Sequence, residues 1–513
     1  MMNNNFPTIP AEKFRFVGDN NRLHDQKFDS KKIGYLRDAF RRFCKNRSSV
    51  VAAIIIMCLV LYAIIVPFFC QSTYSLAPTD TMNLFYRQLT PRNQLCVDLG
   101  LDFWNGTESM KMDDKTKTYY EAIGQETGNP VIVKIQSQTT STDGKVVYNT
   151  KVNSYTLSGF ENLTLTEEEY QNIQRWQKET GIQVIYPAVA DKNQTNADIW
   201  YKVNKKGVAI LDKDGNLQAN YRTSGNDGNY DSLRIEGDPG KVNPASSERY
   251  RYAKVTGDSS AVSYQCRVFK YTYFQYRYGS EPSFLFGTDN YGKDIFTRLA
   301  SGARFSLVFA VCISCINLFI GVVYGAIEGY FGGKVDMIME RITDVLARVP
   351  FMVVATLFQL HLAKRAGPVL SLLFAFVLTG WIGTASTVRM QFYRFKGQEY
   401  VLASRVLGAS DWRIMFRHIF PNSLGTLITS SVLVIPGVIF SESSLTYLGI
   451  VNLDSSTSTS VGTMLANAKD ALSSYPHIIL FPAIFIALLE ISFNLFGNGL
   501  RDAFNPSLRG ADE

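Results

Sequence analysis

The chain has 513 residues, 46% of them apolar, and a formal net charge of +7. Such a charge can indicate nucleic-acid binding, but the basic residues cluster beside long apolar runs, so membrane topology explains them and nucleic acid is not an expected partner. No GxxxxGK(S/T) motif is present, which excludes ATP binding by a P-loop, and the four histidines all lie outside residues 71–285. A catalytic site based on histidine or on the usual zinc ligands is therefore excluded from that region.

The first apolar run, residues 48–69, is long enough to cross a bilayer as a helix. The segment 31–47 before it contains one acidic residue, Asp38, and seven basic residues: Lys31, Lys32, Arg37, Arg41, Arg42, Lys45 and Arg47. This excess predicts that the N-terminal tail, residues 1–47, is cytoplasmic. No small-residue cleavage site ends the run, so we interpret residues 48–70 as a transmembrane helix and not as a signal peptide.

Residues 71–285 are hydrophilic and predict a folded extracellular domain of the α+β class, inserted between membrane helices. Thr166 and Glu169 match a capping box, which predicts a helix from there to Thr180, with Gly181 as its end. Asp-Gly turn signals at 143–144 and 214–215 accompany four strand-like runs, residues 131–136, 145–152, 182–189 and 207–212.

Three features of this region leave alternatives open. A disulfide between Cys96 and Cys266 is possible, but two cysteines far apart in sequence do not imply one. Asp212, Asp214 and Asn216 partly match a calcium loop, yet the glycine falls before the third ligand instead of after it, so a hairpin turn is preferred and no metal is expected. A carboxylate pair of the glycosidase type also stays open, because the spatial pairing of the many acidic residues is unknown.

Five more apolar runs predict five further membrane helices within the segment 286–513: residues 304–327, 340–362, 368–390, 424–449 and 477–499. Six crossings bring both termini to the cytoplasm and keep residues 71–285 outside. The fold class expected is an all-α polytopic membrane protein with an inserted α+β domain, since only closed helices or barrels satisfy the backbone in a bilayer.

Between the fourth and fifth of these six runs lies a short polar and basic segment, residues 399–422, which we call the docking segment. Gly408 interrupts its helical pattern, Ser410 can cap the next turn, and Pro421 predicts a stop, so the expected shape is helix, bend, helix, end. Positive charges place this segment on the cytoplasmic side: Arg394, Lys396, Arg405, Arg413 and Arg417. A segment of this kind must lie outside the bilayer and contact a partner.

The docking segment resembles the coupling loop of ABC importer permeases, in which a small-residue pair precedes a glycine and, thirteen positions later, a proline. Ala403 and Ser404 form the pair, and Gly408 and Pro421 are the anchors. Leu402 departs from the family pattern, where an acidic residue is common. The resemblance implies a coupling loop at residues 396–422 whose contacts to an ATPase come from Ala403, Ser404, Arg405, Gly408, Ala409, Asp411, Arg413 and Pro421.

Further segments narrow the resemblance to the C-type permeases of dipeptide and oligopeptide importers, with the type I importer fold: residues 36–47, 286–307, 329–350 and 493–506. That family implies a permease subunit that forms half of the pore for peptides. Its implied partners are a B-type permease, two ABC ATPase subunits that bind ATP and Mg²⁺, an extracellular peptide-binding lipoprotein, the peptide and membrane lipid. No cofactor is expected in this chain, and the bacterial plasma membrane is the expected location.

Two other functions stay open: a permease of this family for nickel or another small solute, and a membrane anchor for an extracellular receptor domain that does not transport. Six crossings with an intact docking segment favour transport, because an anchor needs one crossing and no coupling loop. The binding protein sets much of the selectivity in these systems, so the pore sequence alone does not separate peptide from nickel.

Charged residues inside the predicted crossings are functional candidates by default, because a charge facing lipid costs several kcal/mol. Glu442 and Glu490 could meet a peptide amine in the translocation path, or could form interhelical hydrogen bonds. A stripe of charged residues recurs every fourth position and is expected to face other subunits or water: Asp336, Glu340, Asp344 and Arg348. Four large apolar residues of the docking segment could pack beneath it or contact the ATPase: Trp412, Met415, Phe416 and Ile419.

Overall fold

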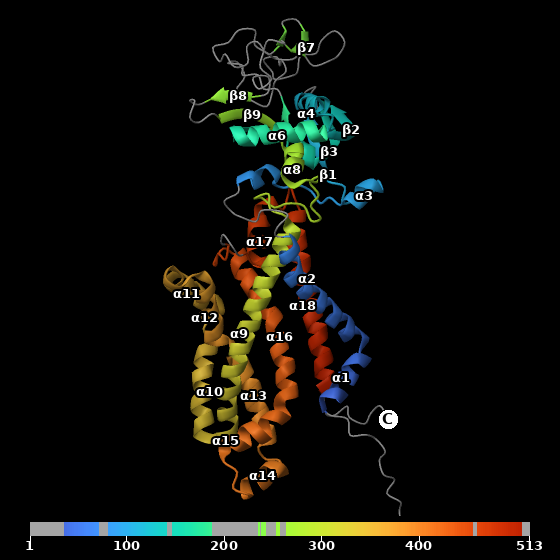
Figure 1. Cartoon of the computed structure of the whole chain (residues 1–513). Coiled ribbons are helices and arrows are strands. Elements are labelled where there is room, and N and C mark those ends of the chain that lie inside the picture. The colour runs from blue at the N-terminus through green and yellow to red at the C-terminus, as the bar shows by residue number, and fades with distance from the viewer. Residues whose placement is uncertain are drawn as a thin grey trace, which may run out of the picture.

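The computed structural model describes residues 35–70, 81–140, 146–186, 234–235, 238–242, 253–256, 263–454 and 459–504. A bundle of long helices carries a smaller part with strands and short helices at one end (Figure 1). Several expectations lie outside the described residues: the strand at 207–212, both Asp-Gly turns, the hairpin or calcium loop at 212–216, and most of the N-terminal tail.

Five helical spans among the described residues are long and apolar enough to cross a membrane: Arg47–Phe69, Ile295–Phe331, Pro368–Phe395, Asp411–Tyr447 and His477–Phe504. They contain α2 (Arg47–Cys70), α9 (Ile295–Phe331), α12 (Pro368–Gly380) with α13 (Ile382–Phe395), α16 (Phe420–Tyr447) and α18 (His477–Phe504). The short helix α1 (Tyr35–Lys45) precedes them. The helical part and the inserted sheets agree with the fold class expected from the sequence.

The sequence predicted a single membrane helix at residues 340–362. In the structure, this run is instead divided between two helices that meet at a bend. Helix α10 (Gly333–Ala347) and helix α11 (Phe351–Ala366) meet at an angle of 74°. Pro350 lies at the break, where it has no N–H for a helical hydrogen bond and disfavours helical backbone at Val349. The part of the chain that the structure describes therefore has five candidate spans, or six if the bent pair crosses as one unit.

Helices α9 and α13 approach each other closely along a line of three glycines in α9. A Cβ atom at Gly321 would lie 2.7 Å from the Cβ of Thr384, and one at Gly325 would collide with Ala385. A Cβ atom at Gly329 would lie 2.8 Å from the Arg389 carbonyl oxygen. The glycines recur every fourth residue, a spacing that lets two membrane helices approach without side chains between them. This GxxxGxxxG spacing is visible in the sequence but was not among the features used to predict helix packing.

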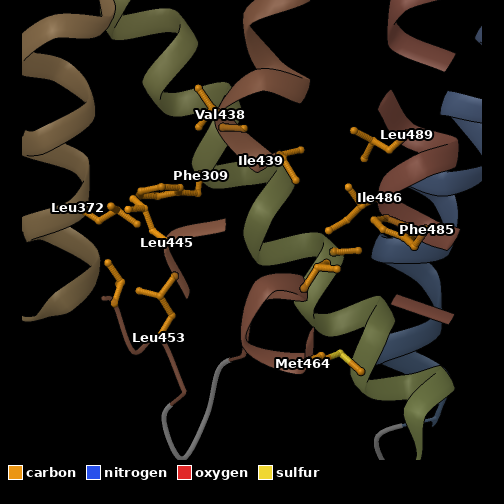
Figure 2. Packing of buried hydrophobic residues seen from close by; sticks show 14 of the residues in the cluster. Phe309, Leu372, Val438, Ile439, Leu445, Leu453, Met464, Phe485, Ile486 and Leu489 are labelled. Atoms are coloured by element: carbon orange, nitrogen blue, oxygen red, sulfur yellow. The ribbon is translucent and has the colours of Figure 1, made fainter. Parts of the chain in front are cut away.

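The core of the bundle is an apolar cluster at the junction of α9, α12, α16, α18 and the short helix α17 (Val461–Ala468) (Figure 2). Its buried side chains come from segments far apart in the sequence: Phe309, Leu372, Val438, Ile439, Leu445, Leu453, Met464, Phe485, Ile486 and Leu489. These contacts join the first half of α9 to the second half of α16 and to α18.

The inserted part contains two larger antiparallel sheets among the described residues. The first has the order β1-β3-β2, from strands β1 (Thr107–Asp113), β2 (Ile132–Thr140) and β3 (Val146–Asn153), and α4 (Asp114–Thr127) lies beside it. The second pairs β9 (Ser263–Phe269) with β4 (Phe160–Thr166), β5 (Ile185–Tyr186) and β8 (Ala253–Thr256). A two-stranded pair, β6 (Arg234–Ile235) and β7 (Asp238–Val242), lies apart from both.

Short helices complete the inserted part: η3 (Thr81–Tyr86), α3 (Gln94–Asp98), α5 (Ser154–Leu157), α6 (Glu167–Thr180) and α8 (Lys270–Tyr278). The capping box is confirmed, since Thr166 and Glu169 satisfy each other's backbone N–H groups at the start of α6, and Gly181 ends the helix at φ 72°. The expected strands at 131–136 and 145–152 correspond to β2 and β3. The strand expected at 182–189 corresponds to β5, which begins three residues later, at Ile185.

Cys96 and Cys266 are both free thiols, so the disulfide that the sequence left open is not formed. Cys266 is buried in the β9 strand, where its Sγ lies 3.8 Å from the Tyr264 carbonyl oxygen. Burial raises the pKa of this thiol to about 12, because the low-dielectric surroundings disfavour the thiolate. Cys266 therefore acts as a small apolar core residue.

The chain enters and leaves the inserted part at neighbouring positions. The Arg92 N–H donates to the Phe284 carbonyl oxygen at 2.8 Å, and the Thr288 N–H donates to the Leu89 carbonyl oxygen at 3.0 Å. Tyr86, Leu89 and Phe284 are buried together beneath the sheets. Residues 81–92 and 284–289 thus form a shared base between the inserted part and the membrane bundle.

Candidate functional site

The docking segment lies at the end of the bundle farthest from the inserted part (Figure 1). It begins with α14 (Glu399–Val406), turns at Gly408 with φ +81°, and continues as α15 (Asp411–Arg413). Backbone hydrogen bonds close the turn, from Gly408 to Arg405 at 3.0 Å and from Ala409 to Ser404 at 3.1 Å. The expected helix, bend and second helix are confirmed, although Ser410, at the N-cap of α15, makes no side-chain cap hydrogen bond.

Glycine is required at position 408 because of the backbone conformation there, and not because a side chain would collide with a neighbour. No atom lies within 4 Å of the position that a Cβ would occupy there. A positive φ near +80° is unfavourable in free energy for any residue that has a Cβ atom, and most unfavourable for a β-branched residue. The bend therefore depends on glycine through the conformational preference of the chain.

The expected end of the helix at Pro421 is wrong. Helix α15 continues through a π-helical turn, Ile414–Ile419, into α16, and Pro421 lies in the first turn of that long helix. In the wide turn the Phe420 N–H donates to the Met415 carbonyl oxygen, five residues back. A wider turn of this type loosens the helix just before the proline, whose missing N–H and bulky ring a regular helix would not accommodate. The docking segment is thus continuous with α16.

Most residues that the resemblance assigned to the coupling contact lie on the surface. Ser404 and Ala409 are half-buried, and the other six are exposed: Ala403, Arg405, Gly408, Asp411, Arg413 and Pro421. Two further residues, not expected from the sequence, are the most exposed large apolar residues that the structure describes: Val406 at 88% and Leu407 at 86%. The signal available in the sequence was a pair of apolar residues directly before the bend of a polar segment.

The opposite face of the docking segment packs on its own chain. Val401, Ile414, Met415 and Ile419 are buried against the ends of α9 and α13. The four large apolar residues therefore do not share one role: some pack beneath the segment, and others remain available for contact with an ATPase. Met415 and Ile419 are core residues, whereas Trp412 is 57% exposed and stacks on the half-buried Phe416 with ring centres 5.5 Å apart.

Two charged residues of the docking segment bind Tyr330, at the end of α9. The Tyr330 hydroxyl donates to Asp411 Oδ1 at 2.6 Å and accepts a hydrogen bond from Arg405 Nη2 at 3.3 Å. The Lys396 ammonium donates to the carbonyl oxygen of Gly329, the residue before Tyr330, at 2.9 Å. Polar contacts as well as apolar packing therefore attach the segment to α9.

The two glutamates proposed for the translocation path lie in different surroundings. Glu442 is fully buried where α9, α16 and α17 meet, and its carboxylate accepts hydrogen bonds from Ser306 at 3.1 Å and from Thr446 at 3.3 Å. This geometry favours the interhelical hydrogen-bond interpretation for Glu442. Glu490 is half-buried on α18, and its carboxylate makes no hydrogen bond or ion pair with another residue that the structure describes.

The expectation that the charged stripe faces other subunits or water is wrong for Asp336, whose side chain is 13% exposed, but not for Glu340, whose side chain is 46% exposed. Asp336 and Glu340 face α13 of the same chain, where both bind the Arg389 guanidinium through two bonds each, at 2.6 to 3.1 Å. A guanidinium offers paired donors that match a carboxylate, so one arginine holds two acids of the facing helix and offsets part of their negative charge. Asp344 pairs with Arg341 on its own helix at 3.2 Å.

A second ion cluster, also missed by our sequence analysis, lies at the other end of α9. Arg298 is 5% exposed and binds Asp289, before the helix, and Asp454, after α16, the latter at 3.1 Å. Asn467 also donates to Asp454 at 3.2 Å. The cluster joins α9 to the base of the inserted part and to α17.

Two protein-family models match the segments of the chain that form the helical bundle. The model for the inner membrane component of binding-protein-dependent transport systems matches residues 301–510. The model for the N-terminal transmembrane domain of oligopeptide transport permease C matches residues 34–91. Neither match reaches residues 92–300, which include most of the inserted part.

Curated relatives match a little under half of this chain. The oligopeptide transport system permease protein OppC of Bacillus subtilis is 42% identical over 224 residues, which cover 44% of this chain and 72% of the relative. The dipeptide transport system permease protein DppC of Lactococcus lactis is 39% identical, over 44% of this chain and 64% of the relative. The OppC of Escherichia coli K12 is 34% identical, over 45% of this chain and 74% of the relative.

Proposed function

Because this chain belongs to the C-type permeases of oligopeptide and dipeptide transport systems, we propose that it forms half of the membrane pore of an ATP-driven peptide importer. The chain is a multi-pass membrane protein of an ABC transporter and not itself an enzyme. Its task is to couple ATP hydrolysis by other subunits to the opening of a path for peptides.

The observation that carries the proposal is the folded docking segment at the far end of the bundle. Its tip presents exposed apolar residues, Val406 and Leu407, beside exposed basic residues, Arg405 and Arg413, while its other face is fixed to α9 and α13. An exposed apolar tip with a polar rim is a suitable anchor for a partner's pocket. A rigid attachment behind the tip is what force transmission from an ATPase requires.

The proposed complex contains a B-type permease, two ABC ATPases that hold ATP and Mg²⁺, and an extracellular peptide-binding lipoprotein. We place it in a bacterial plasma membrane with six crossings, counting α10 and α11 as one. Both termini and the docking segment then lie in the cytoplasm, and the inserted part lies outside. The basic residues before α2 and around the docking segment support this orientation.

The inserted part is proposed to help seat the peptide-binding lipoprotein. Its base, residues 81–92 and 284–289, adjoins the start of α9. The Asn290 side chain donates to the carbonyl oxygen of Asn467, in α17, at 2.7 Å. A folded part attached at this end of the bundle adds contact surface beside the outer opening of the pore.

The proposal is tested by reconstituting the four-subunit complex in lipid vesicles and adding the binding lipoprotein with labelled peptide. We expect peptide uptake that requires both ATP and the lipoprotein, and no competition by nickel ions. Uptake of nickel in place of peptide would establish the small-solute alternative. Binding of peptide without any ATP-dependent uptake would establish the alternative of a membrane-anchored receptor.

A further inference from the structure

Tyr330 joins the two arms of the docking segment with one hydroxyl group. Arg405, in α14, donates to that hydroxyl at 3.3 Å, and Asp411, at the start of α15, accepts from it at 2.6 Å. The two arms are separated by the turn at Gly408. The Arg405 guanidinium also lies over the Tyr330 ring, 5.7 Å from its centre. A change in the orientation of either arm therefore acts on the same side chain.

The side chain of Tyr330 is 7% exposed and belongs to the apolar cluster beneath the docking segment. Apolar contacts in that cluster tolerate sliding, because dispersion and burial have little directional preference. Hydrogen bonds depend steeply on distance and angle, so the two polar contacts fix the angle between the segment and α9. Tyr330 thus supplies the directional part of the attachment.

Helix α9 extends from this attachment to the outer end of the bundle without a break. It has 37 residues, no internal proline, and a length of about 55 Å at 1.5 Å per residue. Near its other end Arg298 binds Asp289 and Asp454, so α9 is fixed to the base of the inserted part as well. A tilt imposed at Tyr330 is therefore carried by one rigid element to the outer opening (Figure 1).

We propose that Tyr330 is the positioning residue through which movement of the docking segment drives α9, and that α9 carries this movement to the base of the inserted part. The inference rests on the proposed function, because it needs an ATPase that moves the docking segment. Tyr330 does not contact peptide or ATP in this role. It acts through Arg405 and Asp411.

The test compares Tyr330→Phe with Tyr324→Phe in the complete reconstituted complex. Both tyrosines lie in α9 and both hydroxyls donate a hydrogen bond, but that of Tyr324 goes to the Met339 carbonyl oxygen in α10, at 2.8 Å. We expect Tyr330→Phe to lower peptide uptake about tenfold, as loss of a hydrogen bond to a charged group can, while ATP hydrolysis stays within about twofold. Tyr324→Phe should leave both rates within about twofold of wild type.

A double-mutant cycle with Asp411→Ala tests whether the hydroxyl acts through this carboxylate. In the Asp411→Ala background, Tyr330→Phe should lower uptake no further than about twofold, because its main partner is already absent. A full additional tenfold loss would show that Tyr330 acts elsewhere, and would overturn the proposal.

Two results would also overturn it. One is an unchanged number of peptides imported per ATP in Tyr330→Phe, as when uptake and hydrolysis fall by the same factor. The other is failure of that variant to co-purify with its partners, which would make the contact structural. Absence of ATP-driven uptake by the wild-type complex is a different result, because it refutes the proposed function itself.

Discussion

At the scale of single residues, the docking segment depends on one backbone conformation. Gly408 has φ +81°, and the space around it is open, so a side chain there meets strain and not collision. The strain is about 1 to 2 kcal/mol for an L-residue with a Cβ, and it is highest for β-branched residues. It is relieved by moving the two arms, which disturbs the contacts that Arg405 and Asp411 make with Tyr330.

We therefore predict that Gly408→Val lowers peptide uptake about tenfold, while the protein still inserts into the membrane. The matched control is Gly397→Val, since Gly397 also has no atom within 4 Å of a Cβ but does not have a positive φ. The measurements are uptake in reconstituted vesicles and the amount of protein in the membrane fraction. Equal effects of the two substitutions would show that the conformation at Gly408 does not matter.

Glu442 offers a second test at this scale. Its carboxylate is buried and bound by Ser306 and Thr446, and Gly462 leaves room for it, since a Cβ there would lie 3.2 Å from Glu442 Oε1. Glu442→Gln keeps an acceptor of the same shape, so uptake should stay within about twofold. Glu442→Leu leaves the buried Ser306 hydroxyl without its partner, whereas the Thr446 hydroxyl keeps its bond to the backbone carbonyl of residue 442. The substitution should lower the unfolding free energy by about 1 to 3 kcal/mol, seen as a lower Tm. Loss of uptake in Glu442→Gln with normal assembly would instead place Glu442 in the translocation path.

At the scale of elements, the contact between α9 and α13 is set by the glycines of α9. Gly321, Gly325 and Gly329 face α13 so closely that its backbone and side chains occupy the space a methyl group would need. Arg389, on the same face of α13, binds Asp336 and Glu340 of α10. Three helices are thus held together near the docking segment, partly by close backbone approach and partly by ion pairs.

Gly325→Ala should separate α9 from α13, because overpacking in a filled interface costs about 1 to 3 kcal/mol. We expect a lower Tm of the complex and weaker coupling of hydrolysis to uptake. Gly437→Ala in α16 is the matched control, since no atom lies within 4 Å of its Cβ position and alanine favours the helix. A variant Gly325→Ala as stable as Gly437→Ala would contradict close packing at this site.

Elements with a complete local signal were predicted from the sequence, and those decided by tertiary contacts were not. The capping box at Thr166 and the turn at Gly408 each use residues a few positions apart, and both are confirmed. Pro421 was misjudged because the π-helical turn before it, Ile414–Ile419, has no simple sequence pattern. Likewise, the pairing of Arg298 with Asp454 joins residues 156 positions apart, so spacing along the chain gave no indication of it.

At the scale of the whole molecule, the inserted part and the docking segment lie at opposite ends of the bundle (Figure 1). They should therefore be on opposite sides of the membrane. In a cysteine-free background, a membrane-impermeant thiol reagent added to intact cells should label Gln138→Cys in β2 and not Ser410→Cys. Both positions are exposed on the protein surface. Labelling of Ser410→Cys alone from outside would invert the proposed orientation.

The last prediction separates the inserted part from the pore. Arg92 and Phe284 are hydrogen-bonded through their backbones at 2.8 Å, so the chain can be closed there by two glycines in place of residues 93–283. A deletion that began at Arg87 would instead remove Leu89, which is buried in the shared base. The family match to residues 34–91 ends at this junction, as it would if a domain had been added to a short outer loop.

We expect the deleted chain to insert and to assemble with its partners, with a lower Tm because Tyr86 and Phe284 lose their buried surroundings. Basal ATP hydrolysis should be unchanged, since the docking segment is untouched at the other end of α9. Uptake should fall mainly at limiting peptide, because the binding lipoprotein loses part of its contact surface. Failure to assemble would make the inserted part structural. Normal uptake at every peptide concentration would refute its part in lipoprotein docking, since a surface that contributes to capture must matter most when peptide is scarce.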